Sequence, residues 1–113
     1  MDKFSAISDP TRRKIIEILA NYGPLSATDI CQRFQVSSPA ISQHLKVLRE
    51  ANLVRVEKRA QQRIYRINPD AILELEDWVK RMTRLWNERF DTLDTILQAE
   101  KTKLARTSKR KEK

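Results

Sequence analysis

Apolar residues recur at helical spacing in the middle of the chain. Ile41, Leu45 and Leu48 follow one another at spacings of four and three, which places them on one side of a helix. Its other side carries small or hydrogen-bonding side chains, namely Ala40, Ser42, Gln43 and Lys46. The pattern predicts an amphipathic helix with one buried face and one polar face.

Signals for the ends of helices surround this stretch. Ser38 is a suitable N-cap and Pro39 a suitable first helical residue, while Asn52 tolerates the left-handed conformation in which helices often end. Upstream, Ser26 followed by Asp29 resembles a capping box and predicts a shorter helix over residues 27–34. A short helix, a break and a second amphipathic helix suggest a helix-turn-helix, whose second helix would enter the major groove of DNA.

After residue 52 the pattern changes to the alternation of β-strands. Leu53, Val54 and Val56 predict one strand, and residues 62–67 predict a second. We expect a β-hairpin whose tip runs from Arg59 to Gln62. A basic hairpin behind a recognition helix would act as a wing that reaches phosphates or the minor groove. The alternative is an ordinary exposed hairpin with solubilising charges.

A further helix is predicted before the helix-turn-helix. Asp9 is a suitable N-cap with Pro10 in the first turn, and the segment Tyr22-Gly23-Pro24 is a strong break. We expect this helix to be the scaffold for the helix-turn-helix. Phe4 and Ile7, just upstream, are expected to pack on it or on another subunit.

The C-terminal part carries a long, nearly heptad-spaced apolar seam. A helix of about 30 residues would be roughly 45 Å long, and its apolar face would be unstable alone in water. We therefore expect it to pair with its copy in a homodimer, whereas the alternative is a helix that breaks near Asn87 and folds back on its own domain. The predicted dimerisation residues are Ile72, Leu75, Val79, Met82, Trp86, Phe90, Leu93 and Leu97, and Trp78, Leu85 and Ile96 widen the seam.

Composition favours helices over a loop-rich β fold. Together with the elements above, we expect a mainly α fold with a small β-hairpin (α+β), a winged helix-turn-helix with a long C-terminal dimerisation helix. The chain has 113 residues, one Gly and 34 % charged residues. We expect one domain over residues 1–100, followed by a basic, disordered tail over residues 101–113.

The net charge of +8 is unevenly distributed. Residues 33–69 carry eight basic and two acidic side chains, and residues 101–113 carry seven basic and one acidic. Residues 70–100 carry four basic and eight acidic side chains. Positive charge thus lies on the predicted helix-turn-helix, the predicted wing and the tail, which favours a polyanion such as double-stranded DNA as the partner.

Other functional classes find little support in the sequence. A single cysteine cannot form an internal disulfide, and neither a secretory signal nor a transmembrane stretch is apparent, so we expect a cytoplasmic protein. We find no pairing of nucleophile and base and no Gly-rich phosphate loop. We therefore expect no enzyme and no cofactor.

Two stretches, AISDPTRRKIIEIL and VSSPAISQHLKVLREANLVRVEKRAQQRIYRIN, resemble the ArsR-type winged-helix transcriptional regulators. The resemblance covers roughly residues 4–80. It implies a homodimer that binds an operator, usually as a repressor, with its recognition helix at the DNA. Together with the predicted wing, the candidate DNA-binding residues are Ser37, Ser38, Ala40, Ser42, Gln43, His44, Lys46, Arg59, Gln62 and Arg63.

The metal-sensing members of that family carry a Cys-x-Cys pair where this chain has Ser26-Ala27-Thr28. A second known metal site uses Asp and His on the C-terminal helix, but the only His in this chain is His44. Cys31 alone cannot build a site that needs three or four ligands. We therefore expect no metal and a resemblance to metal-independent repressors, including those that repress their own operon. A ligand- or metal-responsive derepressor and a non-specific architectural DNA-binding protein remain the alternatives.

Overall fold

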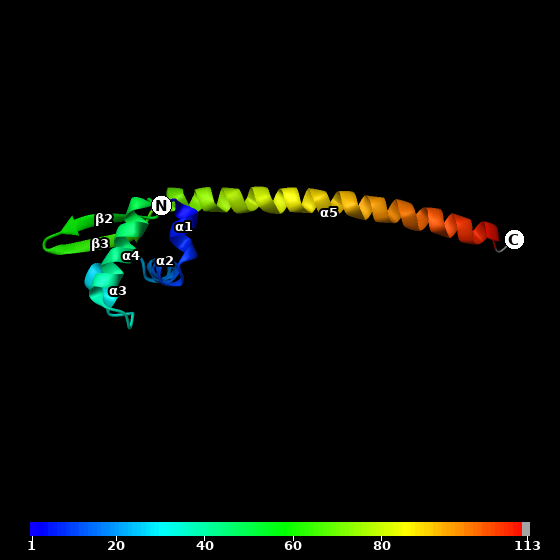
Figure 1. The fold of residues 1–113 in the computed structure, drawn as a ribbon. Helices are drawn as coiled ribbons and strands as arrows, with labels where there is room; N and C mark the ends of the chain where they lie inside the picture. The colour runs from blue at the N-terminus through cyan, green and yellow to red at the C-terminus, as the bar shows by residue number, and fades with distance from the viewer. Residues whose placement is uncertain (112–113) are drawn as a thin grey trace. The chain divides into compact units, whose positions relative to one another are not determined.

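The computed structural model describes the backbone of residues 1–111 and the side chains of residues 1–104. Two compact units make up the chain, the first over Met1–Glu76 and the second from Asp77 onward. The first unit contains seven complete helices and strands and the start of helix α5, Pro69–Lys111, which continues through the second (Figure 1).

Two helices open the first unit. Helix α2 covers Pro10–Tyr22, and its N-cap Asp9 accepts a hydrogen bond from the backbone N–H of Arg12 at 2.9 Å, as the sequence predicted. It ends at Gly23, whose φ of 77° lies in the left-handed region that favours glycine. Before it lies helix α1, Lys3–Ser8, which the sequence analysis did not separate from its surroundings.

The helix-turn-helix is formed by α3, Ala27–Cys31, and α4, Ser38–Glu50. Helix α3 ends three residues earlier than predicted. The predicted N-cap of α4 was also wrong by one residue, because the hydroxyl of Ser37 accepts the capping bond from the N–H of Ala40 at 3.3 Å. Pro39 is then the second helical residue, where its missing N–H again costs nothing. Asn52, as expected, is left-handed, with φ 61°.

The predicted hairpin is present as β2, Val54–Arg59, and β3, Gln62–Ile67. The two strands are antiparallel, and Arg59 opposes Gln62 across a two-residue turn. In that turn Ala60 adopts a φ of 54°. A third strand, β1, Leu25–Ser26, pairs with β3 and makes the order β1-β3-β2, so the sheet has one strand more than predicted.

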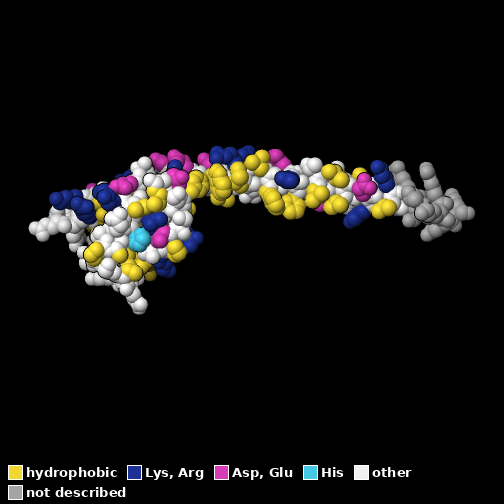
Figure 2. All heavy atoms as spheres, in the orientation of Figure 1, with side chains coloured by type: hydrophobic (Ala, Val, Ile, Leu, Met, Phe, Trp, Pro, Cys, Tyr) yellow, Lys and Arg dark blue, Asp and Glu magenta, His cyan; other side chains and the backbone are white. Residues whose placement is uncertain are grey.

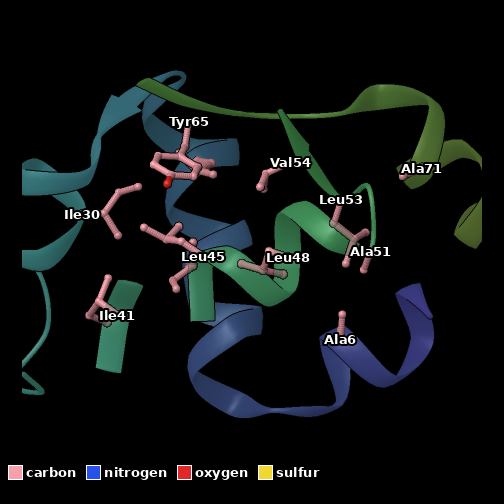
Figure 3. Close-up of a cluster of buried hydrophobic side chains, with 12 residues drawn as sticks. Ala6, Ile30, Ile41, Leu45, Leu48, Ala51, Leu53, Val54, Tyr65 and Ala71 are labelled. Atoms are coloured by element: carbon pink, nitrogen blue, oxygen red, sulfur yellow. The ribbon is translucent and has the colours of Figure 1, made fainter. Parts of the chain in front are cut away.

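The core of the first unit lies where α4 meets the other helices and the sheet (Figure 3). The three predicted apolar residues of α4 are fully or almost fully buried, as are Ile15 of α2 and Ile30 of α3. Tyr65 of β3 closes the core on the sheet side. This packing fixes α4 on three sides and leaves its polar side exposed.

Helix α5 spans Pro69–Lys111 without a break at Asn87. Residues 101–111, expected to be disordered, are helical, and residues 112–113 lie outside the described residues. The composition of this tail is highly charged, but Lys, Arg and Ala are also good helix formers. At the other end of α5, Ile72 and Leu75 pack against the core of their own unit, so these two predicted dimerisation residues are already half-buried.

Asn68 connects the hairpin to α5 and is buried. Its amide group donates a hydrogen bond to the backbone oxygen of Asn52 at 2.8 Å, and its side-chain oxygen accepts one from the N–H of Asp70 at 3.2 Å. The side chain of Asn68 therefore caps the start of α5 and also binds Asn52, the left-handed residue that follows the predicted recognition helix.

We expect Asn68→Ala to lower the free energy of unfolding by about 1–3 kcal/mol, because it leaves the backbone oxygen of Asn52 without this donor and removes a helix cap. Asn68→Asp is the matched control, since it keeps the acceptor for the cap and replaces the donor by a carboxylate oxygen. It should recover part of the loss. Urea unfolding of both variants measures the two contributions, and equal stability of Asn68→Ala and the wild type would contradict this role.

Candidate nucleic-acid interface

The exposed side of α4 is held outward by the burial of its apolar side. Ser42, Gln43 and Lys46 are exposed, as the spacing predicted. Ala40 is half-buried, and the hydroxyl of Ser37 accepts the hydrogen bond that caps the helix. The structure therefore presents a row of short polar and basic side chains along the outer side of the predicted recognition helix.

A groove of about 430 Å³ runs between α4 and strand β3. Three basic side chains line it, Lys46 and Arg49 from the helix and Arg63 from the strand. Each of these residues is exposed. The other lining residues are Ala27, Pro39, Ser42, Gln43, Leu45 and Tyr65. The groove is therefore positively charged, and it is bounded by the polar row of α4 and by the wing.

The strand register divides the wing arginines between two faces. Lys58 pairs with Arg63. Each lies two positions from a residue of the pair Val56 and Tyr65, so all four side chains share the face turned toward α4. Arg59 pairs with Gln62 one position further along and lies on the opposite face. The sequence analysis had assigned Arg59, Gln62 and Arg63 to the wing without distinguishing its faces, and the strand register separates Arg63 from the other two.

Arg59 and Arg55 lie on that opposite face, and each forms an ion pair with an acidic side chain. A guanidinium nitrogen of Arg59 lies 3.4 Å from a carboxylate oxygen of Glu57, and one of Arg55 lies 3.4 Å from Asp70. Both pairs are exposed, so they are weak. On the face of the wing turned away from α4, acidic side chains thus partly offset Arg55, Arg59 and Arg66, whereas strands β2 and β3 place no acidic side chain on the face that carries Lys58 and Arg63. Figure 2 shows Lys and Arg side chains gathered over the hairpin.

Two candidate residues, Arg49 and Lys58, were missed. Arg49 follows Lys46 by three positions and Ser42 by seven, so it lies on the same side of α4. Lys58 lies two positions after Val56 and so shares its face of the strand. Helical and strand periodicity could have identified both residues.

His44 lies toward α2 and not along the groove. Its Nδ1 atom is 3.5 Å from a guanidinium nitrogen of Arg12 and 3.9 Å from a carboxylate oxygen of Asp9. Arg12 in turn donates from Nε to the backbone oxygen of Ala6 at 2.7 Å. This cluster joins the recognition helix to the junction of α1 and α2, which is a packing role for His44. A contact of His44 with DNA stays a prediction.

The pKa of Asp9 is lowered from its ordinary value. The main cause is the hydrogen bond from the backbone N–H of Arg12, opposed by partial burial and supported by the nearby His44 and Arg12. A carboxyl with a depressed pKa contributes stability above its unfolded pKa, and this contribution is lost as the pH falls through the folded pKa.

We accordingly expect Asp9→Ala to destabilise the protein by about 1 kcal/mol at neutral pH, through loss of the N-cap. The difference from the wild type should shrink as the pH falls below the ordinary pKa of aspartate. Asp9→Asn retains the cap without the charge, so its stability should not show this pH dependence. Thermal unfolding at pH 7 and pH 3 checks this, and a difference that grew at low pH would contradict it.

The residues relevant to metal binding are not brought together. Within residues 1–104 no three His, Cys, Asp or Glu side chains are placed so that they could hold a metal ion. Cys31 is half-buried and packs against the core. In the part of the chain that the structure describes, no helix is long and apolar enough to cross a bilayer.

A helix-turn-helix with an adjoining basic hairpin defines the winged helix-turn-helix class of DNA-binding proteins. Residues 9–56 match the family model described as "Bacterial regulatory protein, arsR family". The chain belongs to this ArsR family of transcriptional regulators.

Two curated relatives and one solved structure show how far the similarity extends. Transcriptional repressor SdpR of Bacillus subtilis is 38 % identical over 76 residues, which is 67 % of this chain and 83 % of the relative. HTH-type transcriptional regulator Rv2034 of Mycobacterium tuberculosis is 38 % identical over 85 residues, 71 % of this chain and 78 % of the relative. An ArsR-like transcriptional regulator from Rhodococcus sp. RHA1 superposes with a TM-score of 0.71 at 29 % identity, covering 82 % of this chain and 87 % of that one.

Proposed function

We propose that this protein is a homodimeric, sequence-specific transcriptional repressor that binds operator DNA through α4 and the wing. The observation that carries the proposal is the basic groove between α4 and β3, lined by Lys46, Arg49 and Arg63. The relative named as a transcriptional repressor, SdpR, supports repression as the outcome of binding.

The position of the groove fits the shape of a DNA duplex. A recognition helix fits the major groove, and a wing beside it reaches the neighbouring minor groove. The sugar–phosphate backbone of one DNA strand must therefore pass between the helix and the wing. In this protein the space between helix and wing is the groove that carries the three basic side chains. We assign Lys46, Arg49 and Arg63 to phosphates, with Lys58 further toward the tip.

The polar row of α4 is assigned to the bases. Gln43 is exposed, lies beside the groove, and can make a paired hydrogen bond to adenine. Ser42 can bond to several bases and discriminates less. Ser38 and Ala40, in the first turn of α4, are proposed to lie at the DNA with them, and Ser37 supports their positions as the helix cap.

Dimerisation is proposed through the exposed apolar side of α5. Val79, Met82, Trp86, Phe90, Leu93 and Leu97 are each 39–60 % exposed, whereas soluble proteins rarely leave so continuous an apolar surface uncovered. A dimer would present two recognition helices to two half-sites, which supplies specificity that a single helix lacks.

We further propose that repression does not depend on a metal and that the protein is not an enzyme. Ser26 and Thr28 stand where the metal-sensing members have thiols, and the hydroxyl of Ser26 caps α3. Such a regulator acts in the cytoplasm, where bacterial DNA lies.

We expect no tight transition-metal complex. A titration with Zn²⁺ against a chromophoric competitor should show only weak capture by Cys31 or His44, and Cys31→Ser should remove the part that is due to the thiol. A tight complex of one Zn²⁺ per subunit that releases DNA would overturn the metal-independent assignment in favour of a derepressor.

The proposed function is tested by selection of duplexes from a random library with the wild-type protein. A dimeric repressor should enrich a pseudo-palindromic sequence with two half-sites one or two helical turns apart. The promoter of its own gene is the first genomic candidate for such a site. Enrichment of no sequence, with tight salt-dependent binding to all duplexes, would favour an architectural DNA-binding protein instead.

A further inference from the structure

The tip of the wing is a two-residue turn with a strained backbone. Ala60 and Gln61 connect Arg59 to Gln62, which pair across the two strands. Within the described residues of the hairpin, Ala60 alone has a positive φ, at 54°. A two-residue turn with a positive φ at its first position only is of type II′, and this position favours glycine. An alanine there is strained, and strained backbone is typical of functional segments.

Uncharged side chains occupy this tip, and basic side chains flank it. The uncharged residues are Ala60, Gln61 and Gln62, with Arg59 before them and Arg63 after them, and all five are exposed. This order fits a tip that enters a groove of DNA, because phosphates line the edges of a groove and base edges form its floor. Figure 1 shows the hairpin extending beyond α4, with the turn at its free end.

The length of the hairpin beyond the basic groove matches the depth of the minor groove of DNA. Arg63 lines the groove between α4 and β3 and is assigned to a phosphate. Gln61 lies two residues nearer the tip, which is about 7 Å at the rise of an extended chain. The minor groove of B-DNA is about 7.5 Å deep and about 6 Å wide. With Arg63 at a phosphate on the edge of the minor groove, the turn therefore reaches the base edges.

Within the tip, Gln61 is the residue placed for base edges. It lies in the turn itself, whereas Gln62 belongs to β3 and pairs with Arg59. Arg59 lies on the face turned away from α4 and forms an ion pair with Glu57. The amide of glutamine both donates and accepts hydrogen bonds, so Gln61 can bond to base edges without bearing a charge.

The minor groove differs between A·T and G·C pairs in one group. A·T pairs present only acceptors, N3 of adenine and O2 of thymine, whereas G·C pairs add the N2 amino group of guanine, which is a donor. We propose that Gln61 is a specificity-determining residue whose amide N–H donates to the acceptors of A·T pairs beside each half-site. The amino group of guanine lies on the floor of the groove and disfavours G·C there. The inference rests on the proposed function and specifies the composition of the operator under the wing.

Inosine distinguishes the two grooves of DNA and so tests the inference. The base pairs beside each selected half-site are replaced one at a time by A·T, G·C or inosine·C. Inosine lacks the N2 amino group, so its pair with C has the major groove of G·C but, like A·T, only acceptors in the minor groove. At the position under the wing, the wild type should bind the A·T and inosine·C operators within about twofold of each other and the G·C operator about fivefold or more weakly.

Two glutamine variants assign this preference to one side chain. Gln61→Ala should bind the three operators within about twofold of one another, because alanine has no side-chain donor. Gln62→Ala is the matched control, since it removes the same amide from the neighbouring residue, and it should keep the preference of the wild type. Thermal unfolding checks that both exposed substitutions leave the fold intact.

Three results would overturn the inference while enriched half-sites leave the proposed function intact. The first is equal binding of the wild type to the three operators at every position. The second is an inosine·C operator bound as weakly as the G·C operator, which would assign the preference to the major groove. The third is a Gln61→Ala variant that keeps the preference, in which case Arg59→Ala in the same assay tests the arginine as the reader. A selection that enriches no sequence would overturn the proposed function and this inference with it.

Discussion

Trp86→Glu is expected to convert the protein to a monomer at micromolar concentration and to weaken operator binding by about a hundredfold or more. Buried tryptophans commonly dominate helix–helix interfaces, and a carboxylate in the same place would have to be desolvated among apolar side chains. Trp86 is 60 % exposed in the single chain and packs on Phe90, so it is available to such an interface. In a dimer, binding of one subunit to its half-site holds the second subunit at a high effective concentration near the other half-site. Loss of the dimer removes this gain in affinity.

Light scattering and a titration on the selected operator measure the two effects of Trp86→Glu. Thr95→Glu is the matched control, since it adds the same charge on the exposed polar side of α5. It should leave both mass and affinity close to wild type. If Trp86→Glu were still dimeric, the interface would lie elsewhere.

Neutralising the groove between α4 and β3 should give the second large effect. The triple variant Lys46→Ala, Arg49→Ala, Arg63→Ala should weaken binding to operator and to unrelated duplexes alike. At low salt we expect a loss of about a hundredfold or more, and the slope of log K against log salt should fall by about three per subunit if each side chain holds one phosphate. The reason is the release of fewer counterions from the duplex.

Single variants divide this effect between the two faces of the wing. Arg63→Ala should lower the salt slope by about one, whereas Arg59→Ala should change it less, because Arg59 lies on the other face beside Glu57. Each removes one positive charge from the wing, so the pair controls for net charge. An equal or larger effect of Arg59→Ala would mean that the outer face of the wing meets the DNA, for example with Arg59 in the minor groove.

Elements with strong local signals were predicted from the sequence almost to the residue. Asp9 and Pro10 start α2, Gly23 ends it, and Asn52 ends the region of α4 as a left-handed residue should. The strand β3 matches the predicted residues 62–67. In each case the signal lies in neighbouring residues, so no knowledge of tertiary packing was needed.

Elements that depend on partners far away in the sequence were missed or misplaced. Strand β1 has only two residues, and it is a strand only because Leu25 and Ser26 pair with Tyr65 and Ile64. Helix α1 has only six residues, and its sequence lacks the length from which a helical period can be recognised.

The candidate site shows the same division. The exposed face of α4 followed from the periodicity of its apolar residues, so Ser42, Gln43 and Lys46 were correctly expected to be accessible. The groove itself is formed by a helix and a strand that are brought together only by the core. For that reason the sequence analysis gave Arg63 and Arg59 the same role in the wing. Only the register of the sheet shows that the two side chains lie on opposite faces.

The central claim is that α4 recognises sequence while the groove beside it holds phosphates, and Gln43→Ala tests this most directly. The measurement is a binding titration on the selected operator and on a scrambled duplex, for wild type and variant, at several salt concentrations. We expect Gln43→Ala to lose about 1–3 kcal/mol of preference for the operator while its affinity for scrambled DNA and its salt slope stay unchanged. An unchanged preference for the operator, with a loss of affinity for both duplexes, would contradict the assignment of α4 to the bases.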